Sequence, residues 1–247
     1  MQAPNRIHVG TSGWSYPHWM ETFYPRDASR DRLLEIYAQQ FLDVEVNTTF
    51  YRLVKEETLR HWYQETPHDF RFAVKASRYI THMKKLKSAR ETLKPFFERI
   101  NLLGNKLGPV VFQLPPHWGF NPERLSEFLQ TLDDIEPDCR FAFECRDHSW
   151  LNQTCYDLLT RHGCALCLYD LDGFQSPQIL TADFAYVRLH GPDGSYQGRY
   201  SEPTLKAWSH TLRDWHAQGV QCYCFFDNDE AGYAPLNAAR LKHLVTS

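Results

Sequence analysis

Ionisable side chains recur two residues apart in strand-like segments of this sequence. Glu144 and Arg146 have this spacing in "RFAFECRDHSW" (140–150), and Arg188 and His190 have it in "VRLHG". Residues two apart in an extended chain point to the same face, so each pair would project its groups together. Carboxylates, guanidinium groups and an imidazole gathered in one place would support general acid–base chemistry and anion binding.

Other apolar segments place polar residues on one face in the same way, crowded toward the C-terminal end. The set predicted from this alternation and from the first loop is Ser12, Glu45, Asn47, Lys75, Gln113, Glu144, Arg146, Arg188 and His190, with Asp170 and Asp227 or Asn228 nearby. The candidate catalytic groups within it are Glu45, Lys75, Glu144 and His190. Three roles are open for Lys75: a phosphate ligand, a Schiff-base amine, or a partner that keeps Glu45 or Glu144 ionised. The alternative for Glu144 and Arg146 is an ion pair that needs no substrate.

Loop residues extend the candidate binding site. The aromatic and glycine-rich "GTSGWSYPHW" (10–19) contributes Trp14, and "RLHGPDGSYQGRYS" (188–201) contributes Tyr200 and Arg199. Further aromatic residues on the same predicted side are Tyr51, Trp118, Trp150 and Tyr196. Rings beside cations suit stacking on bases or sugars, although ordinary packing under loops explains them equally well.

The elements that must position these residues alternate between strand-like and helix-like segments. Strands are predicted at 6–10, 43–47, 71–77, 109–114, 140–146, 165–170, 184–191 and 221–227. Helices are predicted at 30–41, 56–65, 89–103, 122–132, 152–162, 202–217 and 235–245, with a loop or single turn after the sixth strand. Such alternation predicts an α/β protein with one parallel eight-stranded (β/α)₈ barrel across 1–247, its unit after strand six abbreviated. The polar ends of the strands would then meet at the catalytic mouth of the barrel.

Composition narrows the classes of protein. The chain has 247 residues, 43% of them hydrophobic and 23% charged, with a formal net charge of −3. These values suit a globular protein, and the polar start "MQAPNR" lacks the features of a signal peptide, so we expect a cytoplasmic protein with no membrane partner. The seven cysteines, including the CxxC of Cys164 and Cys167, are expected to pack in the core. No intrinsic metal is expected, because Lys75, Arg146 and Arg188 would oppose a cation; a divalent ion on the carboxylates and His190 is the alternative.

Several motifs also resemble one known family, the YecE-like proteins called domain of unknown function 72. They are "GTSGWSY", "VEVNTTFYRL", "FRFAVKASRYITH", "LGPVVFQLPP", "FAFECRDHSW", "VRLHG" and "FFDNDEAGYAPLNA", in this order along nearly the whole chain. The resemblance implies a TIM barrel of unassigned activity. It also implies recurring positions at Glu45, Asn47, Tyr51, Lys75, His82, Gln113, Glu144, Arg146, Trp150, Arg188, His190 and Asn228. Asp227 departs from the asparagine pair typical of the family.

Three functions fit these residues. The leading hypothesis is an enzyme, a hydrolase, lyase or isomerase, whose mouth binds a phosphorylated, nucleotide-like or carboxylated small molecule. The second is a nucleic-acid-binding or endonuclease IV-like protein, for which the basic run "KASRYITHMKKLKSAR" (75–90) is the local signal. The third is a metabolite-binding protein without catalysis. The sequence carries no signal for a cofactor or for an oligomeric state.

Overall fold

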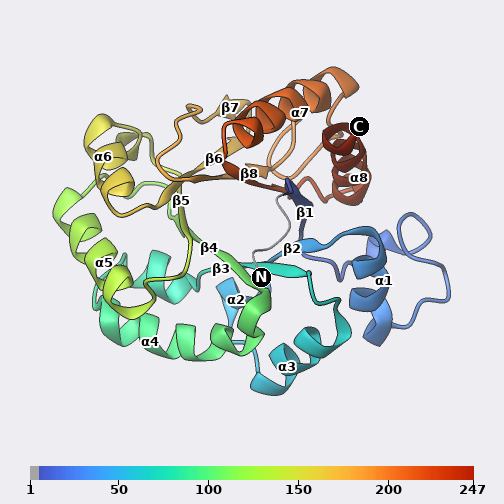
Figure 1. The fold of residues 1–247 in the computed structure, drawn as a ribbon, viewed down its shortest axis with the longest axis horizontal. Coiled ribbons are helices and arrows are strands. Elements are labelled where there is room, and N and C mark those ends of the chain that lie inside the picture. The colour runs from blue at the N-terminus through green and yellow to red at the C-terminus, as the bar shows by residue number, and fades with distance from the viewer. Residues whose placement is uncertain (1–5) are drawn as a thin grey trace.

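Eight parallel strands close into a barrel in the computed structural model, which describes residues 6–247 (Figure 1). The strands are β1 (His8–Ser12), β2 (Asp43–Val46), β3 (Arg71–Lys75), β4 (Leu107–Leu114), β5 (Phe141–Cys145), β6 (Ala165–Leu171), β8 (Phe184–Leu189) and β9 (Gln221–Phe226). Pairing of β1 with β9 and of β5 with β6 completes the closure. The predicted barrel and all eight of its strands are therefore confirmed.

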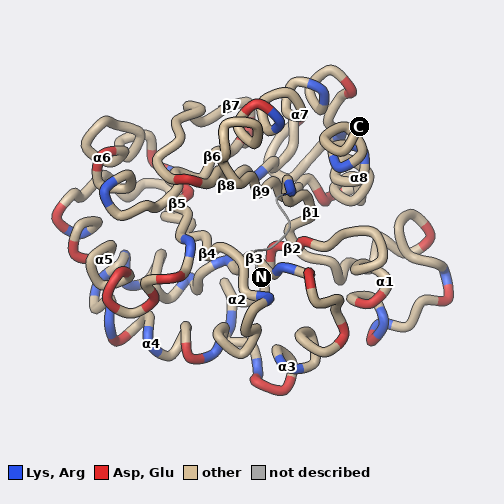
Figure 2. The backbone as a smooth tube through the Cα atoms, viewed as in Figure 1, with Lys and Arg blue, Asp and Glu red and all other residues tan. Residues whose placement is uncertain are grey.

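Helices surround the barrel, as Figure 1 shows. They are α1 (Leu33–Gln40), α2 (Thr48–Tyr51), α3 (Glu56–Glu65), α4 (Ala89–Ile100), α5 (Pro122–Ile135), α6 (Gln153–Arg161), α7 (Glu202–Ala217) and α8 (Tyr233–Thr246). Seven of these match predicted helices, and the one-turn α2 was not predicted because four residues carry no measurable periodicity. Figure 2 shows both signs of charge spread over the outer helices, which is typical of solvated helix faces.

The segment after β6 differs from the other connections. The chain turns back at residues 172–173, and the short strand β7 (Phe174–Gln175) pairs antiparallel with the end of β6. The prediction of an abbreviated unit is confirmed, and the structure replaces the predicted loop with a small hairpin. Within the basic run, residues 79–83 form a π-helical turn, and α4 begins at Ala89, where the helix was predicted to start.

The barrel separates two apolar layers. Outward-facing residues such as Phe72, Phe112 and Phe143 pack against the helices in the main core. The lower lumen is filled by a second, smaller group, namely Ala73, Val111, Ala142, Ala165, Cys167, Phe184, Tyr186, Tyr223 and Phe225. This filling closes the lumen below the polar groups, which therefore lie toward one end of the barrel. We call this end, at the C-terminal ends of the strands, the mouth.

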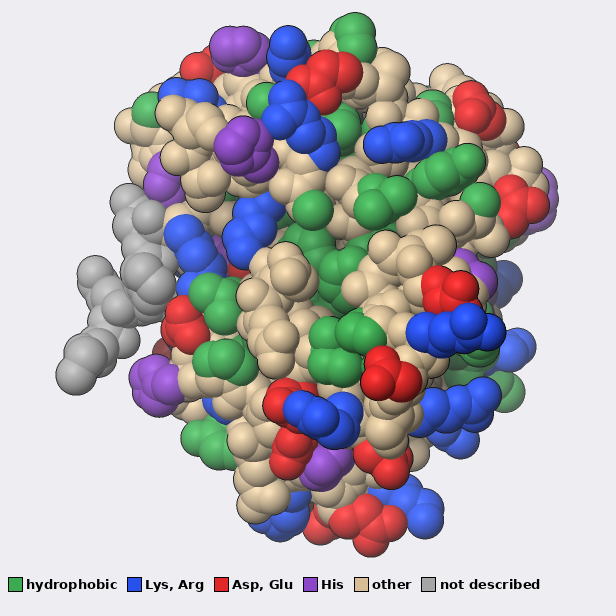
Figure 3. Space-filling view, turned by 90° about the vertical axis from the view of Figure 1, so that its right-hand side faces the viewer, with side chains coloured by type: hydrophobic (Ala, Val, Ile, Leu, Met, Phe, Trp, Pro, Cys, Tyr) green, Lys and Arg blue, Asp and Glu red, His purple; other side chains and the backbone are tan. Residues whose placement is uncertain are grey.

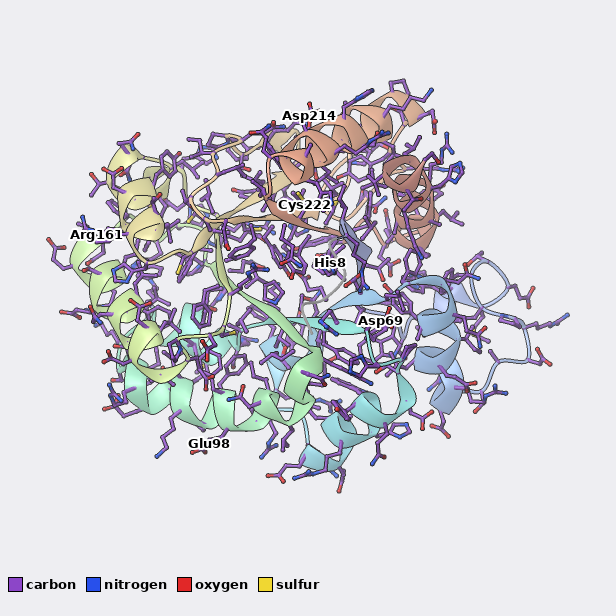
Figure 4. The ribbon with its side chains drawn as sticks, in the orientation of Figure 1. His8, Asp69, Glu98, Arg161, Asp214 and Cys222 are labelled. Carbon is purple, nitrogen blue, oxygen red and sulfur yellow. The ribbon has the colours of Figure 1, made fainter. Side chains whose placement is uncertain are left out.

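The opposite end of the lumen is closed by a polar cluster. His8 lies near the barrel centre in Figure 4, whereas Glu98 and Asp214 lie on outer helices. The His8 ring stacks on Tyr223 with centroids 4.3 Å apart, and its Nδ1 lies 2.6 Å from Asp43 Oδ1. Both contacts hold His8 in place, so this end of the lumen is a packed floor.

Two further observations bear on the expectations from composition. All seven cysteines are free thiols, and every one except the half-buried Cys139 is buried in the core. None of the helices within residues 6–247 is long and apolar enough to cross a membrane. The polar start of the chain, residues 1–5, lies outside the described residues.

Candidate functional site

Arg188 is the centre of a buried ion-pair cluster at the mouth. Its side chain, from β8, is fully buried and contacts three carboxylates. Nε donates to Glu45 Oε2 at 2.9 Å, Nη1 to Glu144 Oε2 at 2.5 Å and Nη2 to Asp227 Oδ2 at 3.1 Å. One guanidinium thus joins residues from β2, β5 and the end of β9. We call Arg188, these three carboxylates, Arg146 and His190 the Arg188 network.

Glu45 has hydrogen-bond partners on both carboxylate oxygens. Ser12 Oγ donates to Oε1 at 2.7 Å, and the Tyr186 hydroxyl donates to Oε2 at 2.7 Å. Together with Arg188, these donors compensate a carboxylate that has no exposed surface. Tyr186 was missed by the sequence analysis, although it lies two residues before Arg188 on the same strand face. Its aromatic ring resembles a core residue in sequence, and that is why it was not selected.

Glu144 is paired with two arginines. Arg146 donates to its Oε1 and Arg188 to its Oε2. Burial alone would raise the pKa of Glu144, but the charges of Arg146 and Arg188 outweigh burial and hold this pKa well below its ordinary value. The predicted Glu144–Arg146 ion pair therefore exists. It is part of a larger cluster, and Glu144 stays ionised at neutral pH.

The ring nitrogens of His190 contact groups of both signs. Arg146 Nη2 lies 2.9 Å from Nε2 and Glu144 Oε2 lies 3.6 Å from it, while the Asp227 carboxylate lies 3.1 Å from Nδ1. The Asp227 carboxylate accepts, so it favours a proton on Nδ1. The backbone N–H of His190 donates to Asp170 Oδ1 at 2.9 Å. The Asp227 pKa is lowered, since hydrogen bonding to His190 and the charge of Arg188 outweigh its burial.

Lys75, at the end of β3, lies beside this network without joining it. Its residue exposure is 8%, and within residues 6–247 no carboxylate oxygen lies within 4.0 Å of Nζ and no hydrogen bond of Nζ is formed. Nζ lies 4.3 Å from the centroid of the Phe50 ring. Burial and the charge of Arg188 lower the pKa of Lys75 to about 8, although Glu144 acts in the opposite direction. A sizeable fraction of Lys75 is therefore an uncharged amine near neutral pH.

Three amide side chains present unused acceptors. Asn47 Oδ1, Gln113 Oε1 and Asn228 Oδ1 are buried and have no hydrogen-bond partner in the described part of the chain. Asn228 uses its Nδ2 to brace the loop after β8, donating to the Gly198 carbonyl at 2.9 Å. Asn47 directly follows β2, and Gln113 lies near the end of β4. These two strands are the neighbours of β3. The strands on both sides of Lys75 therefore supply hydrogen-bond acceptors that the protein itself leaves unused.

Two further predicted residues lie around Lys75. Tyr51 is 71% exposed and follows Phe50, while the His82 ring lies 5.0 Å from the Phe50 ring. Burial and the charge of Lys75 lower the pKa of His82, so its imidazole is neutral at pH 7. Phe50 is the residue that joins this group, and sequence reasoning missed it because nothing distinguishes it from a core phenylalanine.

Tyr200 is connected to the network through Asp170. Its hydroxyl donates to Asp170 Oδ1 at 2.5 Å and accepts from the Gly191 N–H at 2.8 Å. Asp170 in turn accepts from the His190 backbone. Tyr200 is nearly fully buried, so its role in the structure is to fix the loop after β8, and its hydroxyl is already satisfied.

Two predicted binding residues lie in the packed core. Trp14 is 9% exposed and contacts Trp62 edge-to-face, with ring centroids 4.9 Å apart, on the outer side of the barrel. Trp150 is fully buried, and its indole N–H donates to the Trp118 carbonyl at 2.6 Å. The structure does not bring either ring to the Arg188 network. Alternation could not place them, because both belong to loops with no fixed period.

The centre of the site is already occupied by a guanidinium. Residues 6–247 contain no group of three or more His, Cys, Asp or Glu residues arranged to hold a metal ion. The physical reason is Arg188, which lies among the three carboxylates and satisfies them. The ring of Tyr169 lies 4.9 Å from the Arg146 guanidinium carbon, which completes the enclosure. Tyr169 was missed by the sequence analysis, although it lies on the same strand face as Cys167.

Comparisons with known proteins agree with this architecture. Residues 8–247 match the model of a family described as "Protein of unknown function DUF72". The chain is 25% identical to UPF0759 protein YunF of Bacillus subtilis, covering 97% of this chain and 94% of that protein. It is 26% identical to UPF0759 protein YecE of Escherichia coli K12, covering 93% and 89%.

A solved structure is similar over the same length. The crystal structure of a DUF72 family protein from Thermotoga maritima has a TM-score of 0.87 and 27% identity, covering 98% of this chain and all of that one. The match of the family model to almost the whole chain, the full-length relatives and the shared barrel lead to one conclusion. This chain belongs to the DUF72 family of proteins.

Proposed function

We propose that this protein is an enzyme that performs acid–base chemistry on a small anionic molecule at the mouth of the barrel. The observation that carries the proposal is Lys75, a buried and unpaired amine beside an otherwise fully paired set of charges. A closed structural cluster would pair every buried cation, because an unpaired buried charge is costly. Lys75 and the unused oxygens of Asn47 and Gln113 therefore support a ligand that supplies the missing partners.

The structure changes which cation we expect to attract the anion. Arg146 and Arg188 were expected to hold it, but each already contacts a carboxylate. Lys75 is the cation at the mouth that lacks a carboxylate within the described residues, so the anionic group of the substrate would approach it. A phosphorylated, nucleotide-like or carboxylated compound fits this requirement, since each carries the charge that Lys75 lacks.

The acid–base groups can also be distinguished. Glu144 stays ionised because its pKa is held well below its usual value, so it orients Arg188 and does not donate protons. Lys75 and His82 have pKa values lowered toward or below neutral pH. Groups whose pKa lies near the working pH transfer protons most effectively. Lys75 and His82 are therefore our candidates for moving protons, and Arg188 contributes by lowering the pKa of Lys75 through its charge.

Turnover of defined compounds tests the proposal. The protein is incubated with a panel of sugar phosphates, nucleotides and hydroxy or oxo acids, and loss of each compound is followed by mass spectrometry. We expect turnover of at least one anionic compound, lost in Lys75→Gln and retained in Lys94→Gln, which changes an exposed lysine on α4. Ligand binding without turnover in the wild type would favour the non-catalytic alternative.

The basic run favours a second candidate, a nucleic-acid-binding protein. Lys85 and Lys87 are exposed and have no ion-pair partner among the described residues, and Tyr79 beside them is 46% exposed. Exposed cations next to an aromatic ring suit a single strand. Binding of a labelled single-stranded oligonucleotide that weakens steeply with salt, and weakens further in the Lys85→Gln/Lys87→Gln variant, would support this candidate. Salt-insensitive binding would reject it.

A further inference from the structure

The surroundings of Lys75 differ from those of an ordinary ion-pairing lysine. The nearby carboxylates are already satisfied: Glu45 accepts from Ser12, Tyr186 and Arg188, and Glu144 accepts from two arginines. The amine instead lies over the face of Phe50, an apolar surface. Thr49 Oγ1 donates to the Lys75 carbonyl at 2.7 Å and fixes the strand end that carries the side chain. A positioned amine without a counter-ion is suited to bond formation.

We propose that Lys75 forms a covalent imine with an aldehyde or ketone that carries a carboxylate or a phosphate. This inference deepens the proposed function, on which it rests, by naming a carbonyl compound as the substrate class. Arrangement in the fold supports it: the amine is at the C-terminal end of a barrel strand, the end at which catalytic residues of such barrels lie. The anionic group would draw the molecule to the mouth. After the imine forms, the positive charge of the iminium would remain beside this anionic group.

The proposed step is balanced without an oxidant or a reductant. The lone pair of Lys75 Nζ attacks the carbonyl carbon, the C=O π electrons move to oxygen, and a proton passes from nitrogen to oxygen to give a carbinolamine. The hydroxyl group then takes a proton from solvent and leaves as water, the nitrogen lone pair forms the C=N bond, and the nitrogen keeps its remaining proton, which gives the positive iminium. His82, whose neutral ring lies 5.0 Å from the same Phe50 ring, is our candidate to take and return the proton during these transfers.

Titratable groups on several elements face the amine and influence its ionisation. They are Arg188 on β8, Glu144 on β5, Asp227 after β9, Glu45 on β2 and His82 in the turn after β3. Burial is the largest influence and favours the uncharged amine, and Arg188 acts in the same direction. The three carboxylates oppose both, so removing one of them is expected to make the amine more reactive at a given pH.

Reductive trapping tests the inference on the intact protein. Pyruvate and dihydroxyacetone phosphate serve as the carbonyl probes, sodium cyanoborohydride reduces any imine to a stable amine, and peptide mass mapping locates the adduct. At pH 8 about half of Lys75 is uncharged, against roughly 0.3% of an ordinary lysine, so we expect labelling at Lys75 to exceed that at a surface lysine about a hundredfold. The extent of labelling should rise with a midpoint near pH 8.

Matched variants separate a site from general lysine chemistry. Lys94→Gln should keep the adduct at full yield, whereas Lys75→Arg keeps the positive charge but should abolish it. Asp227→Asn should move the midpoint of labelling to lower pH, because it removes a carboxylate that favours the charged amine. Adducts spread over exposed lysines in proportion to their exposure, or no adduct with either probe, would overturn the inference.

Failure of this inference is distinguishable from failure of the proposed function. If Lys75→Arg still turns over a compound from the panel, no imine is needed, and the proposed function stands with Lys75 as the partner of the anion and His82 as the group that moves protons. If Lys75 is labelled selectively but no compound is turned over, the reactive amine stands and the proposed enzyme activity is rejected.

Discussion

Arg188 is the residue on which the site depends most, because one guanidinium contacts three buried carboxylates. Replacement by methionine keeps much of its apolar volume but leaves Glu45, Glu144 and Asp227 without their shared partner. Breaking a buried charge cluster in this way costs about 3–5 kcal/mol, so we expect Arg188→Met to lower the free energy of unfolding by that amount. Urea denaturation measures it.

An exposed ion pair provides the comparison for Arg188. Arg240 pairs with Glu202 at the surface, where water already solvates both charges. Arg240→Met should leave the urea midpoint almost unchanged. Equal losses of stability in the two variants would show that the buried cluster contributes no more than a surface pair.

Lys75 is expected to affect stability in the opposite direction from Arg188, because its burial without a partner is unfavourable. Its pKa falls from an ordinary 10.5 to about 8, so the folded protein releases a proton that the unfolded chain still binds between these values. Above pH 10.5 the burial of Lys75 therefore carries no ionisation penalty. The penalty grows as pH falls, and the stability attributable to this group is fully lost once pH has fallen through 8. At pH 7 the penalty corresponds to about 3 kcal/mol.

Lys75→Met removes this penalty. We expect the variant to be more stable than the wild type at pH 7, with the difference shrinking steadily as pH rises from 8 to 10.5. Unfolding free energies from urea titrations across this range measure the difference. A gap that does not change with pH would mean that Lys75 ionises normally in the folded protein.

At the scale of elements, the loop after β8 holds the network in register. Gly191 has a φ of +119°, and a Cβ placed there would lie 2.1 Å from the Gln197 carbonyl oxygen. Its N–H also donates to the Tyr200 hydroxyl, which bonds Asp170 and so supports His190. An element with no regular hydrogen-bonding pattern is thus fixed by one glycine and one tyrosine.

Gly191→Ala should therefore displace this loop. Backbone strain of this kind costs of order 1–3 kcal/mol, and we expect at least that loss of stability together with loss of turnover. Gly119→Ala is the control, because a Cβ at Gly119 would meet only Ser149 Oγ at 3.8 Å. Thermal unfolding and the turnover assay together measure the two effects; wild-type behaviour of Gly191→Ala would show that the loop tolerates the methyl group.

For the molecule as a whole, buried carboxylates set the stability in acid. The pKa values of Glu144 and Asp227 are lowered in the fold, so their contribution is present above their unfolded values and is lost as pH falls through the folded ones. Asp170, whose pKa is raised by burial, opposes this trend nearer neutral pH. We expect stability to decline below about pH 4, and less steeply in Asp227→Asn. Urea midpoints measured from pH 5 to 2 test this.

The relative arrangement of the helices leaves open space on one side of the molecule. A cavity of about 680 Å³ lies between α1, α2 and α3, lined by residues that include Leu34, Leu53 and Trp62. Figure 3 shows the side of the molecule at the right of Figure 1, where α1 and α8 lie, with apolar side chains near the middle of this face and charged ones around them. This cavity is outside the barrel wall, because Trp62 packs on the outward-facing Phe72. This cavity is therefore separate from the Arg188 network.

The barrel and much of its mouth were predictable from the sequence because strand alternation is a local property. Period two indicated which residues of several strands face the lumen, and these included Glu45, Lys75, Glu144, Arg188 and His190. Loops have no such period, so Trp14 and Trp150 were assigned to the site although both pack in the core. Tyr186 and Phe50 were overlooked, since an aromatic residue in a strand or short helix resembles ordinary core.

Sequence by itself determined which ionic groups face the lumen, since that depends on neighbours two residues away along the chain. Only the tertiary structure decided which of them pair. Arg188 is surrounded by carboxylates from β2 and β5 and from the end of β9, and this leaves Lys75 without one. Such pairing depends on distances between strands far apart in sequence, which are set when the barrel closes and its lower lumen fills with side chains.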